Sequence, residues 1–483
     1  EKVFEKITKL SFLNLEKLKT GHLLTILTND ITLIGEVMMY LLRLIVRIPI
    51  ILIGSVIMAI FISPKLSMIL ILVVPITIII VSILMKKSFP KFQKLQEQID
   101  DVNMVVRENI NANKVVKNFV SEDYEIEKFR KSNDSLRKIT INAVRTINIT
   151  MPSVMLIVNL TIVVVLLIGG NSVINNKMAI GDVIAFIEYL TNILTSLLMA
   201  SVIIVMLSHS EASALRVNQI FNSEEDIINK NKHKKEQIKG NIEFKNVEFS
   251  YENGNGELVL SNINLKINAK ENVGIVGSTG SGKTTLVNLI ARYYDVTKGS
   301  ILIDDKDIRE YDLNFIRKKI VLAMQQPIIF SGTIKENLKY ASSNITDEKM
   351  IDIAKLTLAD EFICKMENKY NDKIEQDASN FSGGEKQRLS LTRALLANPD
   401  ILILDDVTSA LDLATDKKVR QNINKNYNIT TLTISSRIST VINTDKIIVL
   451  DDGKIVGFDK HENLLKNNKI YQEIYNSQNK EGK

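Results

Sequence analysis

The segment GSTGSGKTT, residues 277–285, decides the fold of the second half of this chain. It matches the pattern G-x-x-x-x-G-K-[ST], follows the strand-like run ENVGIV and precedes the helical run TTLVNLIARYY. Glycines let backbone amides curl around phosphate groups, and the positive end of a helix dipole attracts the same groups. A chance glycine-rich turn is the alternative, and the flanking strand and helix argue against it. The phosphate-binding residues predicted here are Gly277, Ser278, Thr279, Gly280, Ser281, Gly282, Lys283, Thr284 and Thr285.

Two further segments extend this pattern. ILILDDVTSALD, residues 401–412, is a buried-strand pattern that ends in Asp405 and Asp406, and we expect Asp405 to hold Mg²⁺ through water. FSGGEKQR, residues 381–388, has the Ser-x-x-Glu spacing of a helix capping box, which predicts a helix starting at Gly383. Exposed glycine amides at a helix start also bind anions well.

Length and composition divide the chain of 483 residues into unlike halves. Residues 39–85 and 146–207 are mostly Ile, Leu, Val and Met, whereas residues 208–483 have a soluble composition. The net charge of +6 does not require a nucleic-acid partner, because nearly as many acids balance the bases. Cys364 is the only cysteine, so no internal disulfide forms, and we expect a buried, inert thiol.

The apolar half predicts helices that cross a membrane, since about 20 mostly apolar residues are needed for one span. The predicted domains are a transmembrane domain at 1–220, a linker at 221–239, a nucleotide-binding domain at 240–475 and a tail at 476–483. The positive-inside rule places both termini and the nucleotide-binding domain in the cytosol of a cell-membrane protein. The four predicted spans lie near 39–62, 66–85, 151–170 and 180–207.

The order and spacing of the phosphate loop, FSGGEKQR, ILILDD and SALD resemble an ATP-binding-cassette (ABC) domain over residues 240–475. The resemblance implies an all-α transmembrane domain followed by an α/β P-loop domain that binds ATP and Mg²⁺. It also implies that Tyr251 stacks on adenine and that Asp412 lies in a loop crossing a dimer interface. Gln325 resembles the glutamine that joins Mg²⁺ and the attacking water to the membrane domain, and the resemblance assigns Thr284, Gln325 and Asp405 to the metal.

In this family two cassettes enclose two ATP molecules, each bound by the phosphate loop of one cassette and the signature of the other. The signature here is Ser382, Gly383, Gly384 and Glu385, which would serve a partner's nucleotide. The first half resembles an exporter, with transverse coupling helices expected at Ser11–Lys19 and Ser121–Phe129. Exporter halves have six spans, so we hypothesise that the first two are missing because the sequence is a fragment.

Two departures from the family pattern concern hydrolysis. Asp406 stands where active members carry a glutamate base, and a carboxylate set back by about 1 Å can cost about 100-fold in rate. Ser436 stands where the family has a histidine that contacts the γ-phosphate. A smaller departure concerns the loop before the signature, where Asp377 and Ala378 replace a glycine pair. The sequence therefore predicts a degenerate ATP site paired with a competent partner, a heterodimer. The predicted catalytic residues are Asp406, Gln325, Ser436 and Lys283.

Other functions remain open at this stage. The main interpretation is a subunit that exports a hydrophobic or amphipathic substrate, with lipid or drug favoured. A regulatory ATP-binding subunit without cargo and a homodimeric exporter with a slow aspartate base are the alternatives, whereas the spans contradict a soluble cassette ATPase. Polar residues within the spans are the candidates for cargo contact: Arg43, Arg47, Asn159, Glu188 and Asn192.

Overall fold

A computed structural model describes residues 1–223, 227, 229, 237–251, 256–342 and 344–480. The chain divides into two compact units, which are described separately. The membrane unit contains Glu1–Phe4 and Gly21–Asn222, and the nucleotide unit contains Glu5–Thr20 and Ser223–Lys483. Most of the predicted linker, and the side chain of Arg43, lie outside the described residues.

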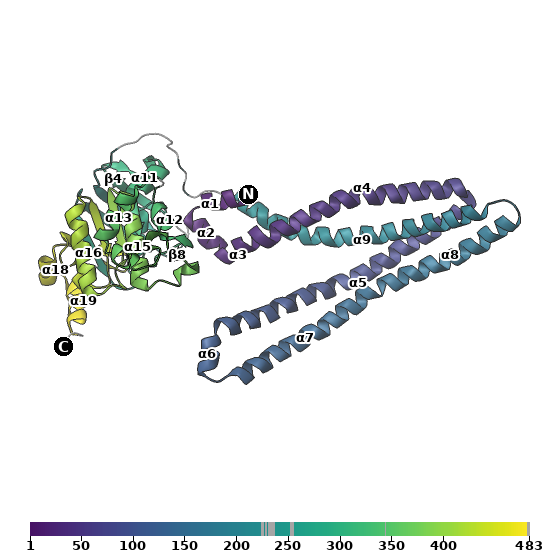
Figure 1. Ribbon diagram of the computed structural model, residues 1–483, viewed down its shortest axis with the longest axis horizontal. Helices are drawn as coiled ribbons and strands as arrows, with labels where there is room; N and C mark the ends of the chain where they lie inside the picture. The colour runs from purple at the N-terminus through teal and green to yellow at the C-terminus, as the bar shows by residue number, and fades with distance from the viewer. Residues whose placement is uncertain (224–226, 228, 230–236, 252–255, 343, 481–483) are drawn as a thin grey trace. The chain divides into compact units, whose positions relative to one another are not determined.

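The membrane unit is entirely helical. Helix α4 packs along α9, and α5 packs along α7 and α8 (Figure 1). Among the residues that the structure describes, four helical stretches are long and apolar enough to cross a membrane, and each overlaps one predicted span: Thr20–Ile62, Pro64–Asn111, Glu122–Ile174 and Ile180–Met199. The elements are α3 (Thr20–Thr25), the π-helical turn η1 (Ile26–Asp30), α4 (Ile31–Ile62), α5 (Pro64–Asn111), α6 (Asn113–Asn118), α7 (Glu122–Asn148), α8 (Thr150–Ile174) and α9 (Ile180–Asn222).

Apolar side chains cover both the inside and the outside of these helices. Phe186, Leu190 and Leu194 of α9 are fully buried, whereas residues such as Phe61 and Ile71 are largely exposed. A helix that is apolar on all sides fits a lipid environment better than water. Close helix packing occurs at Gly169, where an added Cβ would lie 3.2 Å from Cγ2 of Val183.

The predicted position of the second coupling helix is wrong. Residues 122–129 are the first turns of the long helix α7, and the short helix is α6, Asn113–Asn118. Three acids lie in the first turn of α7, where the helix dipole favours negative charge. A start signal carries no information on length, and α7 continues to Asn148.

The nucleotide unit contains three sheets. Strands β3, β6, β9, β10 and β11 run parallel in a six-stranded sheet of order β12-β11-β3-β10-β9-β6, to which β12 adds antiparallel. The other sheets are β2-β1-β4-β5 and β7-β8. The strands are β1 (Ile242–Phe249), β2 (Leu260–Ile267), β3 (Asn272–Gly277), β4 (Lys298–Ile303), β5 (Lys306–Asp307), β6 (Ile320–Ala323), β7 (Gly332–Thr333), β8 (Lys373–Ile374), β9 (Ile401–Asp405), β10 (Thr430–Ile434), β11 (Lys446–Asp451) and β12 (Lys454–Asp459).

Helices pack around these sheets. These helices are α2 (Phe12–Leu18), α10 (Lys283–Ile290), η2 (Ile308–Glu310), α11 (Leu313–Lys319), α12 (Ile334–Lys339), α13 (Asp347–Leu356), α14 (Asp360–Ile363), η3 (Lys369–Asn371), η4 (Gln376–Ala378), α15 (Gly383–Leu396), α16 (Leu413–Asn426), α17 (Ile438–Val441), α18 (His461–Asn467) and α19 (Lys469–Lys480). Helix α1 (Lys2–Lys9) is divided between the two units. Helix α19 continues past residue 475, so part of the predicted tail is helical. Cys364 is exposed rather than buried, because it follows the short surface helix α14.

Candidate functional site

Parallel strands bring the predicted phosphate and metal residues to one edge of the six-stranded sheet. Ile434 of β10 pairs with both Ile275 of β3 and Asp405 of β9, so the carboxyl ends of these strands meet. Ligands in such sheets bind beyond the carboxyl ends of the strands. The site is therefore assembled by strand register from segments more than 100 residues apart in the sequence.

The phosphate loop connects β3 to α10 and needs its glycines. Gly280 and Gly282 have φ angles of 84° and 94°, in the left-handed region that favours glycine. A Cβ at Gly277 would lie 2.2 Å from the carbonyl oxygen of Leu450, and one at Gly282 would lie 2.7 Å from Cδ2 of Leu260. Ser278, Thr279 and Gly280 are exposed, so the loop presents its backbone outward at the start of α10.

Lys283 lies within this loop. Its Nζ donates hydrogen bonds to the carbonyl oxygens of Gly277 (2.9 Å) and Ser278 (2.6 Å). Burial lowers the pKa of Lys283, although the charges of Asp405 and Asp406 favour its protonated form. The ammonium group is thus in place for an anion that the loop would bind.

Asp405 and Thr284 form a donor set that suits Mg²⁺. Asp405 is buried at the end of β9, its carboxylate is hydrogen-bonded to Thr284, and burial raises its pKa. A cation beside this carboxylate would favour the charged form. Among the described residues no group of three or more His, Cys, Asp or Glu could hold a metal alone. Mg²⁺ usually binds through one or two carboxylates together with substrate phosphates, so these residues fit it.

The two residues that depart from the family pattern lie against each other. Asp406 follows β9 and Ser436 follows β10, and the Ser436 hydroxyl donates to Oδ2 of Asp406 at 3.4 Å. The amide of Asp406 donates to the carbonyl of Ile434, and its φ of 47° places it in the left-handed region. The short carboxylate of Asp406 is therefore hydrogen-bonded to the short hydroxyl of Ser436, at the same edge of the sheet as Asp405.

Gln325 lies at the same edge of the sheet. It follows β6, whose Ala323 pairs with Leu404 of β9, one residue before Asp405. Its side chain is exposed. The position is compatible with the metal role expected from the resemblance, which stays a prediction.

The signature residues start helix α15, as the capping-box spacing predicts. The hydroxyl of Ser382 accepts from the amide of Glu385 at 3.3 Å, and Oε2 of Glu385 accepts from the amide of Ser382 at 2.8 Å. A Cβ at Gly384 would lie 3.2 Å from Cδ2 of Leu411. In the described part of the chain, no hydrogen bond joins residues 382–385 to the phosphate loop. The start of the helix packs closely against Ala410 and Leu411, which leaves little room for a side chain at position 384.

Asp412 has a structural task that sequence reasoning did not assign. It is the N-cap of α16 and accepts from the amides of Ala414 and Thr415, which lowers its pKa. Gln387 was also missed: its side chain binds Ser409 (3.0 Å) and the amide of Ala410 (3.0 Å). Gln387 thereby ties the signature helix to the loop between β9 and α16, a contact that no sequence signal showed.

The positions where the family has a glycine pair are strained. Asp377 and Ala378 have φ angles of 56° and 51°, and Ala378 is buried. An L-residue in the left-handed region costs roughly 1–2 kcal/mol. The backbone therefore keeps the conformation that suits glycine even though the side chains have changed.

We expect Ala378→Gly to raise the free energy of unfolding by about 1 kcal/mol, because it relieves this strain. Urea unfolding of the purified protein measures the change. The matched control is Ala354→Gly, since Ala354 is equally buried but lies inside helix α13, and it should destabilise by about 1 kcal/mol. A loss of stability in both variants would contradict the strain.

Tyr251 is held from three directions in the nucleotide unit. Its hydroxyl is 2.9 Å from Oγ1 of Thr285 in the phosphate loop, and its ring lies edge-on to Phe249 and Tyr294. The ring centroids of Tyr251 and Tyr294 are 5.2 Å apart. Tyr251 is thus fixed beside the phosphate loop, as a residue that stacks on a nucleotide base would need to be.

Helix α2 docks within the nucleotide unit close to this tyrosine. It lies at the predicted first coupling position, with Ser11 as its N-cap. Leu13 is buried in the core of the unit, and the ring centroid of Phe12 lies 4.4 Å from that of Tyr293. The guanidinium of Arg317 lies 5.7 Å from the Tyr293 centroid. Tyr293, with Arg317 against its ring, therefore forms an aromatic pad on which Phe12 of α2 packs.

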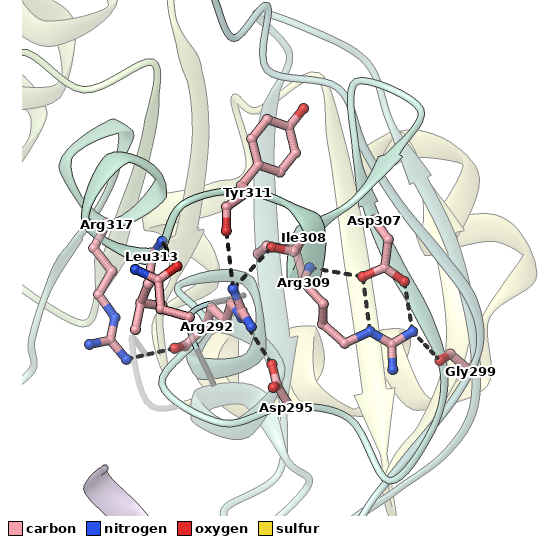
Figure 2. Close-up of polar contacts among 10 residues, drawn as sticks. Arg292, Asp295, Gly299, Asp307, Ile308, Arg309, Tyr311, Leu313 and Arg317 are labelled. Carbon is pink, nitrogen blue, oxygen red and sulfur yellow. Dashed lines mark hydrogen bonds and ion pairs between the residues drawn. The ribbon is translucent and has the colours of Figure 1, made fainter. Parts of the chain in front are cut away.

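The residue before Tyr293 is a buried arginine, Arg292, whose polar contacts are shown in Figure 2. Arg292 is 2% exposed, pairs with Asp295 at 3.0 Å and donates to the carbonyls of Ile308 and Tyr311 at 3.4 Å. Its own carbonyl accepts from Nη2 of Arg317 at 2.9 Å. Arg292 therefore connects the residues around Tyr293 to the segment before α11, and a buried charge of this kind could not be recognised from sequence alone.

Two family models match the chain. The model described as "ABC transporter transmembrane region" matches residues 1–198, and the model described as "ABC transporter" matches residues 260–409. The predicted fold class, a helical transmembrane domain followed by an α/β nucleotide-binding domain, is confirmed.

Curated relatives match almost the whole chain. An uncharacterized ABC transporter ATP-binding protein, YfiB of Bacillus subtilis, is 34% identical over 99% of this chain and 82% of its own length. An ATP-dependent lipid A-core flippase of Desulfotalea psychrophila is 34% identical over 99% of this chain and 83% of its own length. A solved bacterial Atm1-family ABC exporter with ATP bound has a TM-score of 0.85 at 23% identity, covering 99% of this chain and 84% of that one.

Proposed function

The chain belongs to the ABC transporters, as an exporter subunit that joins a transmembrane region to an ATP-binding domain, and on this premise we propose that its own ATP site holds nucleotide but hydrolyses it slowly. The observation that carries the proposal is the contact between Asp406 and Ser436. A base one methylene too short, hydrogen-bonded to a serine in place of a histidine, is poorly suited to activate water.

The residues expected to bind nucleotide match the family pattern, whereas the residues expected to act in hydrolysis depart from it. The loop around Lys283 would bind the phosphates, Tyr251 would stack on the base, and Thr284, Asp405 and Gln325 would hold Mg²⁺. Bound Mg²⁺ neutralises charge on the phosphates. This chain would therefore bind and orient ATP, whereas Asp406 and Ser436 would activate the attacking water poorly and so limit hydrolysis.

A second subunit is part of the proposal, since members of this family work as dimers. The partner would carry the glutamate and histidine that this chain lacks, and it would use the intact signature that begins at Ser382. A homodimer would instead place two short bases in two identical sites. The asymmetry between an intact signature and an altered base favours the heterodimer.

Two surfaces of the chain support docking between subunits. The turn between α6 and α7 exposes Phe119 and Val120 and is followed by the acids of the first turn of α7. In the nucleotide unit a groove of about 640 Å³ is lined by Arg317, Lys318 and Arg393 together with the exposed Tyr340. Acidic and apolar groups on one surface match basic and aromatic groups on the other.

The proposed cargo is a hydrophobic or amphipathic molecule, and the name of the Desulfotalea relative favours a lipid. The proposed location is the cell membrane, with the nucleotide unit in the cytoplasm. Glu188 and Asn192 of α9 remain candidates for cargo contact because polar groups within spans are costly unless they serve a function.

Inverted membrane vesicles that contain this chain and its partner should take up a fluorescent phospholipid analogue only when ATP is present. Lys283→Ala should lower uptake about tenfold, because a hydrogen bond to a charged phosphate is lost. Lys454→Ala, which removes an exposed lysine from β12, is the control and should change nothing. ATP binding without ATP-driven uptake would instead favour a regulatory subunit that has no cargo.

A further inference from the structure

An ion pair in the membrane unit, between a buried carboxylate and a partly exposed arginine, lies outside the ATP site. Asp30 is the last residue of the π-helical turn η1 and is 3% exposed. Arg216 of α9 donates from Nε to Oδ2 of Asp30 at 2.8 Å and from Nη2 to Oδ1 at 2.6 Å. The hydroxyl of Ser213 also donates to Oδ1 at 2.8 Å and accepts from Nη2 of Arg216 at 3.0 Å. We name Asp30, Ser213 and Arg216 the clamp.

The chain crosses between the two units after Thr20 and after Asn222, two points that we call the passages. The clamp joins two segments of the membrane unit that lie close to these passages. The chain leaves the nucleotide unit after Thr20, shortly after α2, and returns to it after Asn222. Asp30 lies about ten residues after the first passage at Thr20. Ser213 and Arg216 lie within about ten residues before the second passage at Asn222. Residues 183 and 186 positions apart are thus bound within about ten residues of these two passages between the units.

Stability alone does not account for this arrangement. The pair adds little net stability, because Asp30 loses its hydration on burial while Arg216 stays partly in contact with solvent. What a bidentate pair adds is a defined register, since the arginine fork accepts a carboxylate in one orientation. The π-helical turn that presents Asp30 is itself a rare conformation that tends to occur at functional positions.

We propose that the clamp makes the segment after α2 and the end of α9 move as one body, so that ATP binding shifts α4 and α9 together. Asp30, Ser213 and Arg216 are positioning residues: they touch neither nucleotide nor cargo. Without the clamp, each passage would transmit movement separately, and the nucleotide unit could rearrange without its membrane helices following. This inference rests on the proposed function, since it concerns how ATP binding reaches the membrane helices.

The test uses the full-length protein with its partner in lipid nanodiscs. Hydrogen exchange of peptides from α4 and α9 is measured with and without ATP and Mg²⁺, and affinity is measured with a fluorescent ATP analogue. The variants are Asp30→Asn, Arg216→Met, the double variant Asp30→Asn/Arg216→Met and Ser213→Ala. The double variant leaves no unpaired buried charge, so a purely structural role predicts that it recovers both stability and response.

We expect every clamp variant to bind the ATP analogue within twofold of the parent. The ATP-dependent change in exchange of α4 and α9 should fall at least fivefold in Asp30→Asn and in the double variant, and about twofold in Ser213→Ala. Glu108→Gln is the control, because it breaks an exposed pair with Lys128 between α5 and α7 and should leave the response intact.

Recovery of the response in the double variant, or a full response in Asp30→Asn, would overturn the clamp. If the charged single variants do not fold, Ser213→Ala decides, and an unchanged response in it overturns the inference. A parent protein that shows no ATP-dependent change in α4 and α9 would contradict the proposed function itself, which separates the two failures.

Discussion

Replacing Asp406 with glutamate and Ser436 with histidine is expected to raise the ATP turnover of the full-length protein about 100-fold. The added methylene moves the carboxylate toward the phosphate edge of the sheet, and the imidazole reaches where the serine hydroxyl stops. Steady-state phosphate release by the chain alone and with its partner measures the effect. Ser436 is exposed, so the larger ring meets no packed neighbour at that position.

The gain must come from this site and not from a change elsewhere. Adding Lys283→Ala to the double variant should abolish it, since the loop lysine contacts the phosphates of the same nucleotide. Asp459→Glu lengthens an acid at the end of β12 by the same methylene and should leave turnover unchanged. Brisk turnover by the parent chain alone would make Asp406 an adequate base, and the homodimeric exporter would then be the better account.

If the proposed heterodimer is right, Ser382→Ala is expected to lower the ATP turnover of the complex about 100-fold, because it would remove a donor to the nucleotide in the partner's site. It also removes the cap of α15, which costs about 1 kcal/mol of stability. The chain offers a matched control for that second effect. Thr333 and Glu336 form the same capping box at the start of α12, so Thr333→Ala should cost similar stability and little turnover.

The comparison of the two alanine variants separates capping from catalysis. Thermal unfolding reports the loss of the cap, and phosphate release by the complex reports the site. Equal losses of turnover in Ser382→Ala and Thr333→Ala would mean that Ser382 acts only as the cap of α15 and has no separate role in turnover. A larger loss in Lys283→Ala than in Ser382→Ala would place the competent site on this chain's own phosphate loop.

Local patterns predicted those features that depend on neighbouring residues. The phosphate loop needs glycine at Gly280 and Gly282 because their φ angles are left-handed, and the capping box needs Ser382 and Glu385 three residues apart. The four apolar stretches predicted candidate spans because their length and composition suffice for that inference. The short helix α6 was not predicted, because the sequence analysis placed the second coupling helix where α7 begins.

By itself, the sequence of this protein determined its class and showed the phosphate loop, the Ser-Gly-Gly segment and the aspartate at position 406, since each is written in a run of adjacent residues. Only the tertiary structure decided which distant groups meet. Parallel register places Asp406 beside Ser436, helix packing brings Arg216 to Asp30, and the fold brings Arg317 to the carbonyl of the buried Arg292. These contacts follow from how strands pair and helices pack, and no local pattern encodes them.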